Sequence, residues 1–150
     1  MIPKPEPRGP KPRRPIKRKG GKRTSRCRAQ RKARLKDCDR VFSLLIRTRD
    51  DWTCKACGSI KNPQCAHIVS RRYRATRWDS RNAVCLCAGC HVRFTFDPLA
   101  WDAWCQEYRG LVYQELRAQA MRGVAHVDYD AELEALKTEL RLWEEHRRGK

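Results

Sequence analysis

The chain has 150 residues, of which 35 are Lys or Arg and 17 are Asp or Glu, so its formal net charge is +18. This length suits one domain with appendages, and the charge favours a polyanionic partner, either nucleic acid or an acidic membrane surface. No apolar run approaches the roughly 20 residues that span a bilayer, and no apolar segment follows the basic N-terminus. We therefore expect a cytoplasmic protein with no membrane span, whose nine cysteines bind metal or stay reduced rather than form disulfides.

Residues 1–36 carry most of the charge, because they hold 16 of the 35 basic residues and a single acid, Glu6. Six of the eight prolines fall within residues 1–15. Proline and like-charge repulsion together predict a disordered basic tail over 1–36, of which 16–36 can become helical on a phosphate backbone. Such a tail either improves solubility or contacts nucleic acid without sequence specificity. The charge density favours the second interpretation, with Lys17, Arg18 and Lys19 as phosphate contacts.

Residues 37–150 are nearly neutral and predict an α+β, mainly helical fold. Apolar residues over 39–49 indicate a helix with a broad apolar face. Residues 64–68 and 83–86 read as short strands, and a helix opens near Ala88. A further helix begins at Asp97-Pro98, because Asp is a good N-cap and Pro suits the first turn. Its stripe of Trp101, Trp104 and Tyr108 indicates a core face rather than a platform for base stacking.

Two helical stretches complete the chain, one between Gly110 and Gly123 and one over 131–146. The last carries Leu133, Leu136, Leu140 and Trp143 on one stripe, which predicts either packing against the body or a dimer interface. We divide the chain into the tail over 1–36, a central domain over 37–110 and C-terminal helices over 111–150. A homodimer built through the last helix is one option.

Two Cys-x-x-Cys pairs are the strongest chemical motif, formed by Cys54 with Cys57 and by Cys87 with Cys90. Two thiolates three positions apart on a tight turn chelate one ion, and two such turns complete a tetrahedral zinc site. Redox pairs and unrelated buried cysteines are the alternatives, and two pairs in an intracellular chain favour zinc. A site closed by four thiolates has a structural role, because it leaves no open position for substrate.

Three further polar residues lie in or beside this cysteine frame, namely His67, Asn82 and His91. Taken singly, each has an ordinary interpretation as a core histidine, a turn residue or a cap of the zinc site. Together, Cys54-x-x-Cys57, Ala66-His67-Ile68 and the run from Arg81-Asn82 to Cys90-His91 resemble an HNH endonuclease of the zinc-knuckle type. The segment from His67 to Asp79 is similar to small bacteriophage HNH proteins, including the NinG (Rap) recombination group. The resemblance covers about residues 40–105.

This resemblance implies a ββα-metal core of two antiparallel strands and a helix around a catalytic divalent ion, Mg²⁺ or Mn²⁺. It implies that His67 is the general base and that His91 is a ligand of the catalytic ion. It also implies that Asn82 holds the His67 region through backbone hydrogen bonds. Arg71, Arg72 and Arg77 are candidates for holding the phosphates.

The chain departs from the family pattern at Ala66, where many members carry an Asp or His that also binds the metal. A third ligand of some members corresponds to Thr95 here. Asp79 or Asp97 could substitute, His67 could itself coordinate the ion, or water and substrate phosphate could complete its shell.

Our first hypothesis is therefore a metal-dependent DNA endonuclease, phage-encoded, that acts in recombination, repair or packaging, with branched DNA such as Holliday junctions as one substrate class. The second is a non-catalytic zinc-containing protein that binds nucleic acid through an HNH-like scaffold. A third, a ribosome-associated or RNA-packaging protein, leaves the spacing of His67, Asn82 and His91 to chance.

Overall fold

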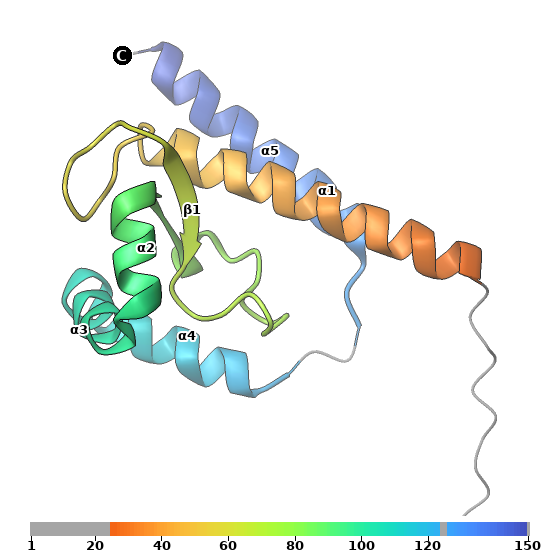
Figure 1. The fold of residues 1–150 in the computed structure, drawn as a ribbon. Coiled ribbons are helices and arrows are strands. Elements are labelled where there is room, and N and C mark those ends of the chain that lie inside the picture. Colours follow the sequence, from red (N-terminus) through yellow and green to blue (C-terminus); the bar gives the residue numbers. More distant parts are fainter. Residues whose placement is uncertain (1–24, 124–125, 150) are drawn as a thin grey trace, which may run out of the picture.

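The computed structural model describes residues 25–123 and 126–149, and the structural statements below refer to these residues (Figure 1). Lys17, Arg18 and Lys19 lie outside them. Along the chain, the described elements are α1 (Ser25–Arg49), β1 (Pro63–His67), the short 3-10 helix η1 (Ser80–Asn82), β2 (Ala83–Cys87), α2 (Ala88–Phe96), α3 (Pro98–Arg109), α4 (Leu111–Met121) and α5 (Tyr129–Arg148). The fold is α+β and mainly helical, as predicted. No described helix combines the length and the apolar character needed to cross a membrane.

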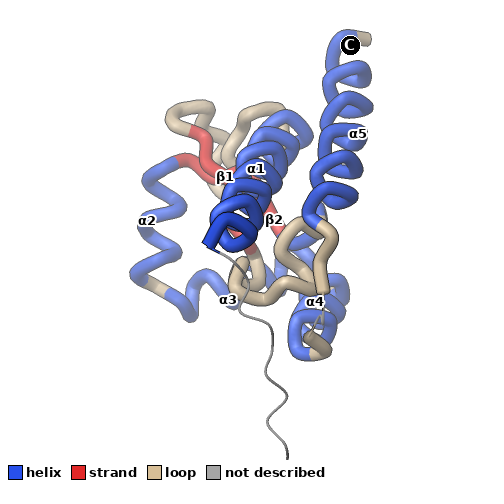
Figure 2. Tube along the Cα trace, turned by 90° about the vertical axis from the view of Figure 1, so that its right-hand side faces the viewer, coloured by secondary structure: helices blue, strands red, loops and turns tan. Residues whose placement is uncertain are grey.

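The two strands form an antiparallel hairpin in which Cys65 lies opposite Cys85 and His67 opposite Ala83. Successive side chains of a strand point to opposite faces of a sheet, and both faces are covered (Figure 2). Helix α1 packs on one face, where the rings of Phe42 and His67 lie 5.4 Å apart. Helix α2 follows β2 directly and packs on the other face, against Val84 and Leu86. The β1–β2–α2 succession is the ββα core that the resemblance implies.

Helix α1 is longer than the sequence predicted, because it begins at Ser25 rather than near Asp39. Residues 25–36, which we assigned to a disordered tail, form its first three turns. The reason lies in residues far along the chain. The Arg31 guanidinium contacts the Tyr129 hydroxyl at 3.4 Å and Arg34 pairs with Asp130 at 2.8 Å. Charge alone favours an extended chain here, and these contacts from the start of α5 hold the helix instead.

Helix α5 packs lengthwise on α1 and runs in the same direction, from contacts with Arg34 to an ion pair of Arg147 with Asp51 (Figure 1). Its leucine stripe is buried in a cluster with the apolar face of α1. The cluster contains Cys38, Phe42, Leu45, Ile46, Trp78, Ala83, Tyr129, Leu133, Leu136 and Leu140. Of the two interpretations of this stripe, the structure supports packing against the body.

A second buried cluster joins the cysteine-rich segment to α2, α3 and α4. It contains Cys54, Ala66, Ile68, Val84, Leu86, Phe94, Cys105 and Tyr113, with Trp101 and Trp104 packed against it. Trp101 and Trp104 of the predicted stripe thus pack against the core, whereas Tyr108, its third member, is exposed. Asp97 caps α3 as predicted, since its carboxylate accepts a hydrogen bond from the Ala100 amide at 2.9 Å.

Candidate functional site

The four cysteines of the two Cys-x-x-Cys pairs meet at one point. Cys54 and Cys57 lie in the loop after α1, Cys87 ends β2, and Cys90 lies in the first turn of α2. Their Sγ atoms all lie within 4.8 Å of one another, and those of Cys57 and Cys87 are 3.7 Å apart. A tetrahedral site with Zn–S bonds of about 2.3 Å requires sulfur atoms about 3.8 Å apart. The cluster is therefore positioned to hold a metal ion.

The electrostatics of this cluster also favour a bound cation. Burial raises the pKa of Cys54, but backbone hydrogen bonds from Cys87, Ala56 and Cys57 outweigh it and lower that pKa to about 7. Burial and the neighbouring thiols raise the pKa of Cys90 to about 12. Four thiolates repel one another in so small a volume, so all four can ionise together only around a cation.

His67 and His91 line a second, separate site, a cavity of about 570 Å³ between the end of β1 and helices α2 and α3. The cavity is lined by Ala66, His67, Ile68, Ser70, Leu86, His91, Phe94, Thr95, Pro98 and Trp101. Its floor is apolar and belongs to the second cluster, while Ser70, Thr95 and Pro98 at its rim are exposed. The two histidines thus border one cavity that opens to solvent, His67 from the strand end beside Phe42 of α1 and His91 from α2.

The tautomer of His67 follows from its hydrogen bond. Its Nε2 lies 2.9 Å from the carbonyl oxygen of Arg77, and a carbonyl only accepts, so Nε2 carries the proton. The lone pair of the neutral ring therefore resides on Nδ1. Burial lowers the pKa of His67 below its ordinary 6.5, against the opposing effect of the Arg77 carbonyl. A neutral imidazole with a fixed tautomer is the state that a general base requires.

His91 is fixed in a similar way. Its Nδ1 lies 2.6 Å from Oε1 of Gln64, which only accepts, so Nδ1 is the donor and Nε2 retains the lone pair. Burial lowers the pKa of His91 and favours its neutral form. A histidine that donates one ring N–H to an oxygen and keeps the other nitrogen unprotonated is the usual state of a metal ligand. No local sequence pattern marks Gln64, 27 positions earlier in the chain, as its partner.

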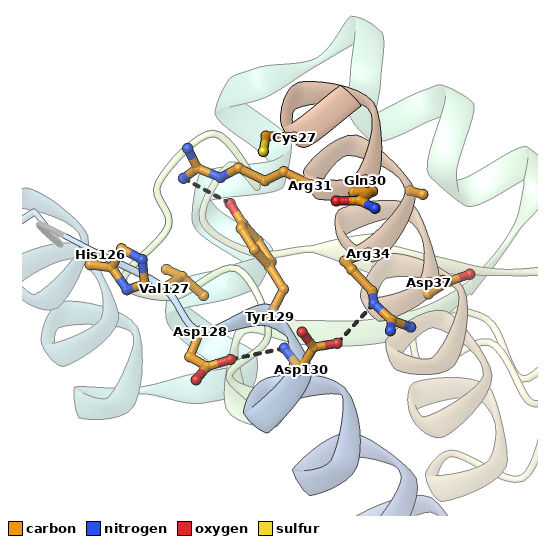
Figure 3. A pocket seen from close by; sticks show the side chains of 11 residues that line it. Cys27, Gln30, Arg31, Arg34, Asp37, His126, Val127, Asp128, Tyr129 and Asp130 are labelled. Carbon is orange, nitrogen blue, oxygen red and sulfur yellow. Dashed lines mark hydrogen bonds and ion pairs between the residues drawn. The ribbon is translucent and has the colours of Figure 1, made fainter. Parts of the chain in front are cut away.

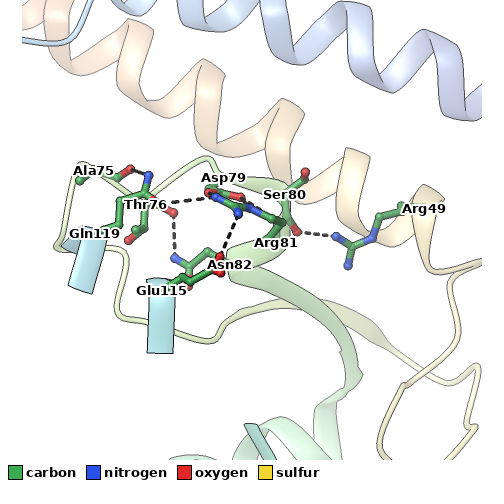
Figure 4. A network of polar contacts seen from close by, with 9 residues as sticks. All are labelled: Arg49, Ala75, Thr76, Asp79, Ser80, Arg81, Asn82, Glu115 and Gln119. Carbon is green, nitrogen blue, oxygen red and sulfur yellow. Dashed lines mark hydrogen bonds and ion pairs between the residues drawn. The ribbon is translucent and has the colours of Figure 1, made fainter. Parts of the chain in front are cut away.

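Asn82 is fully buried and ties together the loop that follows β1 (Figure 4). Its Nδ2 donates to the carbonyl oxygens of Val69 at 3.0 Å and Thr76 at 2.8 Å, and its Oδ1 accepts from the Val69 amide at 2.7 Å. One side chain thus satisfies three backbone groups of the segment that separates His67 from Arg77. Within the described residues its side chain bonds to neither histidine, so its place is that of a positioning residue.

Arg77 differs from the prediction, because its side chain is committed within the protein. Its guanidinium makes a two-pronged ion pair with Asp39 of α1 at 2.9 and 2.6 Å, and it donates to the Arg71 carbonyl at 2.8 Å. Only 14% of the side chain is exposed. The Asp39 carboxylate also accepts from Trp78 Nε1 at 3.0 Å. Arg77 therefore holds the loop whose carbonyl fixes His67, and it is not free to hold a phosphate.

The remaining candidates are placed as follows. Arg71 and Arg72 are exposed, directly after Ser70 at the cavity rim. Asp79 pairs with Arg81 at 2.7 Å and caps η1, and Asp97 caps α3. Neither carboxylate lines the cavity, so the structure does not support them as substitute metal ligands.

The comparison with protein families agrees with this geometry. Residues 54–96 match the family model described as HNH endonuclease. This segment is therefore similar to an HNH domain. The matched segment spans both cysteine pairs, His67, Asn82 and His91, whereas α1, α3, α4 and α5 lie outside it. No curated protein and no solved structure matches the chain significantly.

The side chains that line the HNH cavity offer few metal ligands, which fits a single divalent ion bound largely by other groups. His91 offers Nε2, and no acidic residue is found among the described residues that line the cavity. Thr95 donates its hydroxyl to the His91 carbonyl at 2.8 Å, and Ala66 offers no donor atom. Water and substrate oxygens would therefore complete the shell, which suits Mg²⁺ or Mn²⁺, ions that keep several waters.

Replacing Asn82 with alanine should destabilise the protein by about 2–4 kcal/mol, because the Val69 amide and the Val69 and Thr76 carbonyls lose their partner in a buried place. Urea unfolding followed by tryptophan fluorescence measures this. Arg81→Ala is the matched control on the adjacent exposed position and should cost under about 1 kcal/mol, since its ion pair is solvent-accessible. An Asn82→Ala variant as stable as the control would show that the loop holds without this side chain.

Proposed function

We propose that the protein is a metal-dependent DNA endonuclease that hydrolyses phosphodiester bonds at the HNH cavity. The observation that carries this proposal is that His67 and His91 both border one open cavity, each with one ring nitrogen fixed by an oxygen acceptor. An apolar floor beneath two oriented, neutral imidazoles is suited to acid–base chemistry on a bound phosphate.

In this proposal, Nδ1 of His67 takes a proton from the water that attacks the scissile phosphorus. The imidazolium that forms keeps its Nε2–H bond to the Arg77 carbonyl, which stabilises the developing positive charge. The ion pair of Arg77 with Asp39 and the hydrogen bonds of Asn82 hold this carbonyl in place. Arg71 and Arg72 at the rim hold the flanking phosphates as charge-assisted donors.

His91 would hold the catalytic ion through Nε2, with its ring oriented by Gln64. When bound, a divalent ion offsets the charge that grows on the phosphate and on the leaving oxygen. The four-cysteine cluster would hold a structural Zn²⁺, which fixes the first turn of α2, and thus His91, relative to β2.

The proposed substrate is DNA. The role in recombination, repair or packaging, the phage origin and the preference for branched DNA follow from the sequence resemblance to small bacteriophage HNH proteins. A homodimer would allow symmetric cleavage of a junction, and its interface would have to avoid the leucine stripe of α5, which is buried against α1.

The test incubates the purified full chain with supercoiled plasmid and with a four-way junction, with Mg²⁺, with Mn²⁺ and without an added divalent ion. We expect nicked or linear products only with an added ion, and His91→Ala should require a higher ion concentration. Intact DNA under every condition would instead support the alternative, a non-catalytic zinc-containing nucleic-acid-binding protein, which the alanine at position 66 favours.

A further inference from the structure

We propose that the first half of α1 is a preformed basic arm that lies along duplex DNA beside the cleaved site, with Arg28, Lys32 and Lys36 as its phosphate contacts. The inference rests on the proposed function for its choice of partner. It adds an interaction surface outside the HNH domain.

The arm, residues 25–36, is a helix of one sign of charge. It contains no acidic residue. Its six basic residues are Arg26, Arg28, Arg31, Lys32, Arg34 and Lys36. Figure 1 shows that it reaches beyond the other described helices. Its twelve residues are about 18 Å long, which corresponds to roughly five base pairs along a duplex.

One side of the arm is anchored to the body, so the helix exists without DNA (Figure 3). Arg31 contacts the Tyr129 hydroxyl, Arg34 pairs with Asp130, and the Cys38 thiol lies 3.4 Å from the Tyr129 carbonyl. These contacts use two of the six cations and fix the orientation of the others.

The other side of the arm carries Arg28, Lys32 and Lys36, which follow one another at intervals of four residues and are all exposed. They precede Asp39 by eleven, seven and three residues, so the helical repeat places them on the same side as Asp39. Asp39 faces the loop after β1, where Arg77 neutralises its charge. The arm therefore presents uncompensated positive charge toward that loop.

This charge continues to the rim of the cavity. Arg77 donates to the Arg71 carbonyl at 2.8 Å, and the exposed Arg71 and Arg72 follow Ser70, which lines the cavity. A path of cations thus leads from the arm to the two histidines. A duplex held at the cavity has its phosphates at regular intervals, which a rigid row of cations at helical spacing can follow.

The test compares two full-length variants that lose the same charge. The first is R28Q/K32Q/K36Q, and the matched control is R26Q/R122Q/R141Q, whose residues are exposed and lie either on the opposite side of the arm or outside it. Glutamine keeps a similar helix propensity. Binding to a 30-base-pair DNA duplex is measured by fluorescence anisotropy across a salt series without added divalent ion. Circular dichroism and zinc content verify the fold. The single variant K32Q, which removes one charge and disturbs the helix least, gives a second measurement of the salt dependence.

We expect the magnitude of the slope of log K against log salt to fall by about 2–3 in the first variant, by about 0.9 in K32Q and by less than 1 in the control. Equal changes in both triple variants would overturn the proposal, because net charge alone would then explain them. A larger loss on an RNA duplex than on DNA would overturn the choice of DNA. Cleavage is scored separately, so that binding through the arm without cleavage overturns only the nuclease, and cleavage with equal slopes overturns only the arm.

Discussion

Replacing His67 with alanine should reduce the rate of DNA cleavage by about two to four orders of magnitude, the usual contribution of a general base. The variant removes Nδ1, the lone-pair nitrogen left by the bond of Nε2 to the Arg77 carbonyl. The loss should appear in kcat rather than in DNA affinity, since the proposed phosphate contacts lie elsewhere. Plasmid nicking under single-turnover conditions measures the rate, and anisotropy measures binding.

The pH profile of the same reaction separates a base from a merely structural histidine. Burial lowers the pKa of His67 below 6.5, so the neutral, active ring predominates at pH 7. Cleavage by the wild type should therefore be nearly constant above pH 7 and fall tenfold per pH unit only below the lowered pKa. In His67→Ala this acidic limb should disappear together with most of the rate.

Two matched variants make the result specific. His126→Ala removes an exposed histidine outside the cavity and should leave rate and profile unchanged. His91→Ala should slow cleavage but retain the acidic limb, because His67 is still present. If His67→Ala cleaves within threefold of the wild type, His67 is not the base and the proposed mechanism fails.

The sequence predicted those parts of the site that depend on short-range spacing. The strands at 63–67 and 83–87 and the start of α2 at Ala88 fall within one residue of expectation, because alternation and helix onset are local patterns. The sequence alone also predicted that the Cys54–Cys57 and Cys87–Cys90 pairs form one metal site. Thiol pairs at this spacing have one common use in a reduced environment.

The sequence did not predict the residues that hold His67, because they come from distant segments. Asp39 and Arg77 are 38 positions apart and meet only when α1 packs on the sheet. Arg77 belongs to a basic segment, which suggested a phosphate contact, and no local pattern distinguishes a committed arginine from a free one.

The prediction that the first helix begins near Asp39 was wrong for a similar reason. Composition over 25–36 predicts self-repulsion, and the stabilising partners Tyr129 and Asp130 lie about one hundred residues later. Tertiary contacts thus override a local preference, as they commonly do for helices. Residues 25–36 therefore form an ordered helical row of cations.

Replacing Cys87 with serine should unfold the HNH domain, the largest effect on stability that we expect. Structural zinc contributes on the order of 10–16 kcal/mol in zinc-finger peptides, which rivals the whole stability of a typical domain, about 5–15 kcal/mol. Cys87 has two functions, since it is a cluster member and its Sγ also accepts the Cys90 amide at the N-cap of α2. Zinc content, circular dichroism and limited proteolysis measure the outcome.

The control is Cys27→Ser, which changes an exposed thiol on α1 and should leave zinc content and melting temperature unaltered. Loss of the ion should expose the 54–96 segment to protease more than α1 and α5, which share a separate apolar cluster. A Cys87→Ser protein that keeps a full equivalent of zinc and its melting temperature would exclude a structural ion at this cluster. Because His91 follows Cys90 directly, the same variant should also abolish cleavage, and excess Mg²⁺ should not restore it, as the ligand itself is displaced.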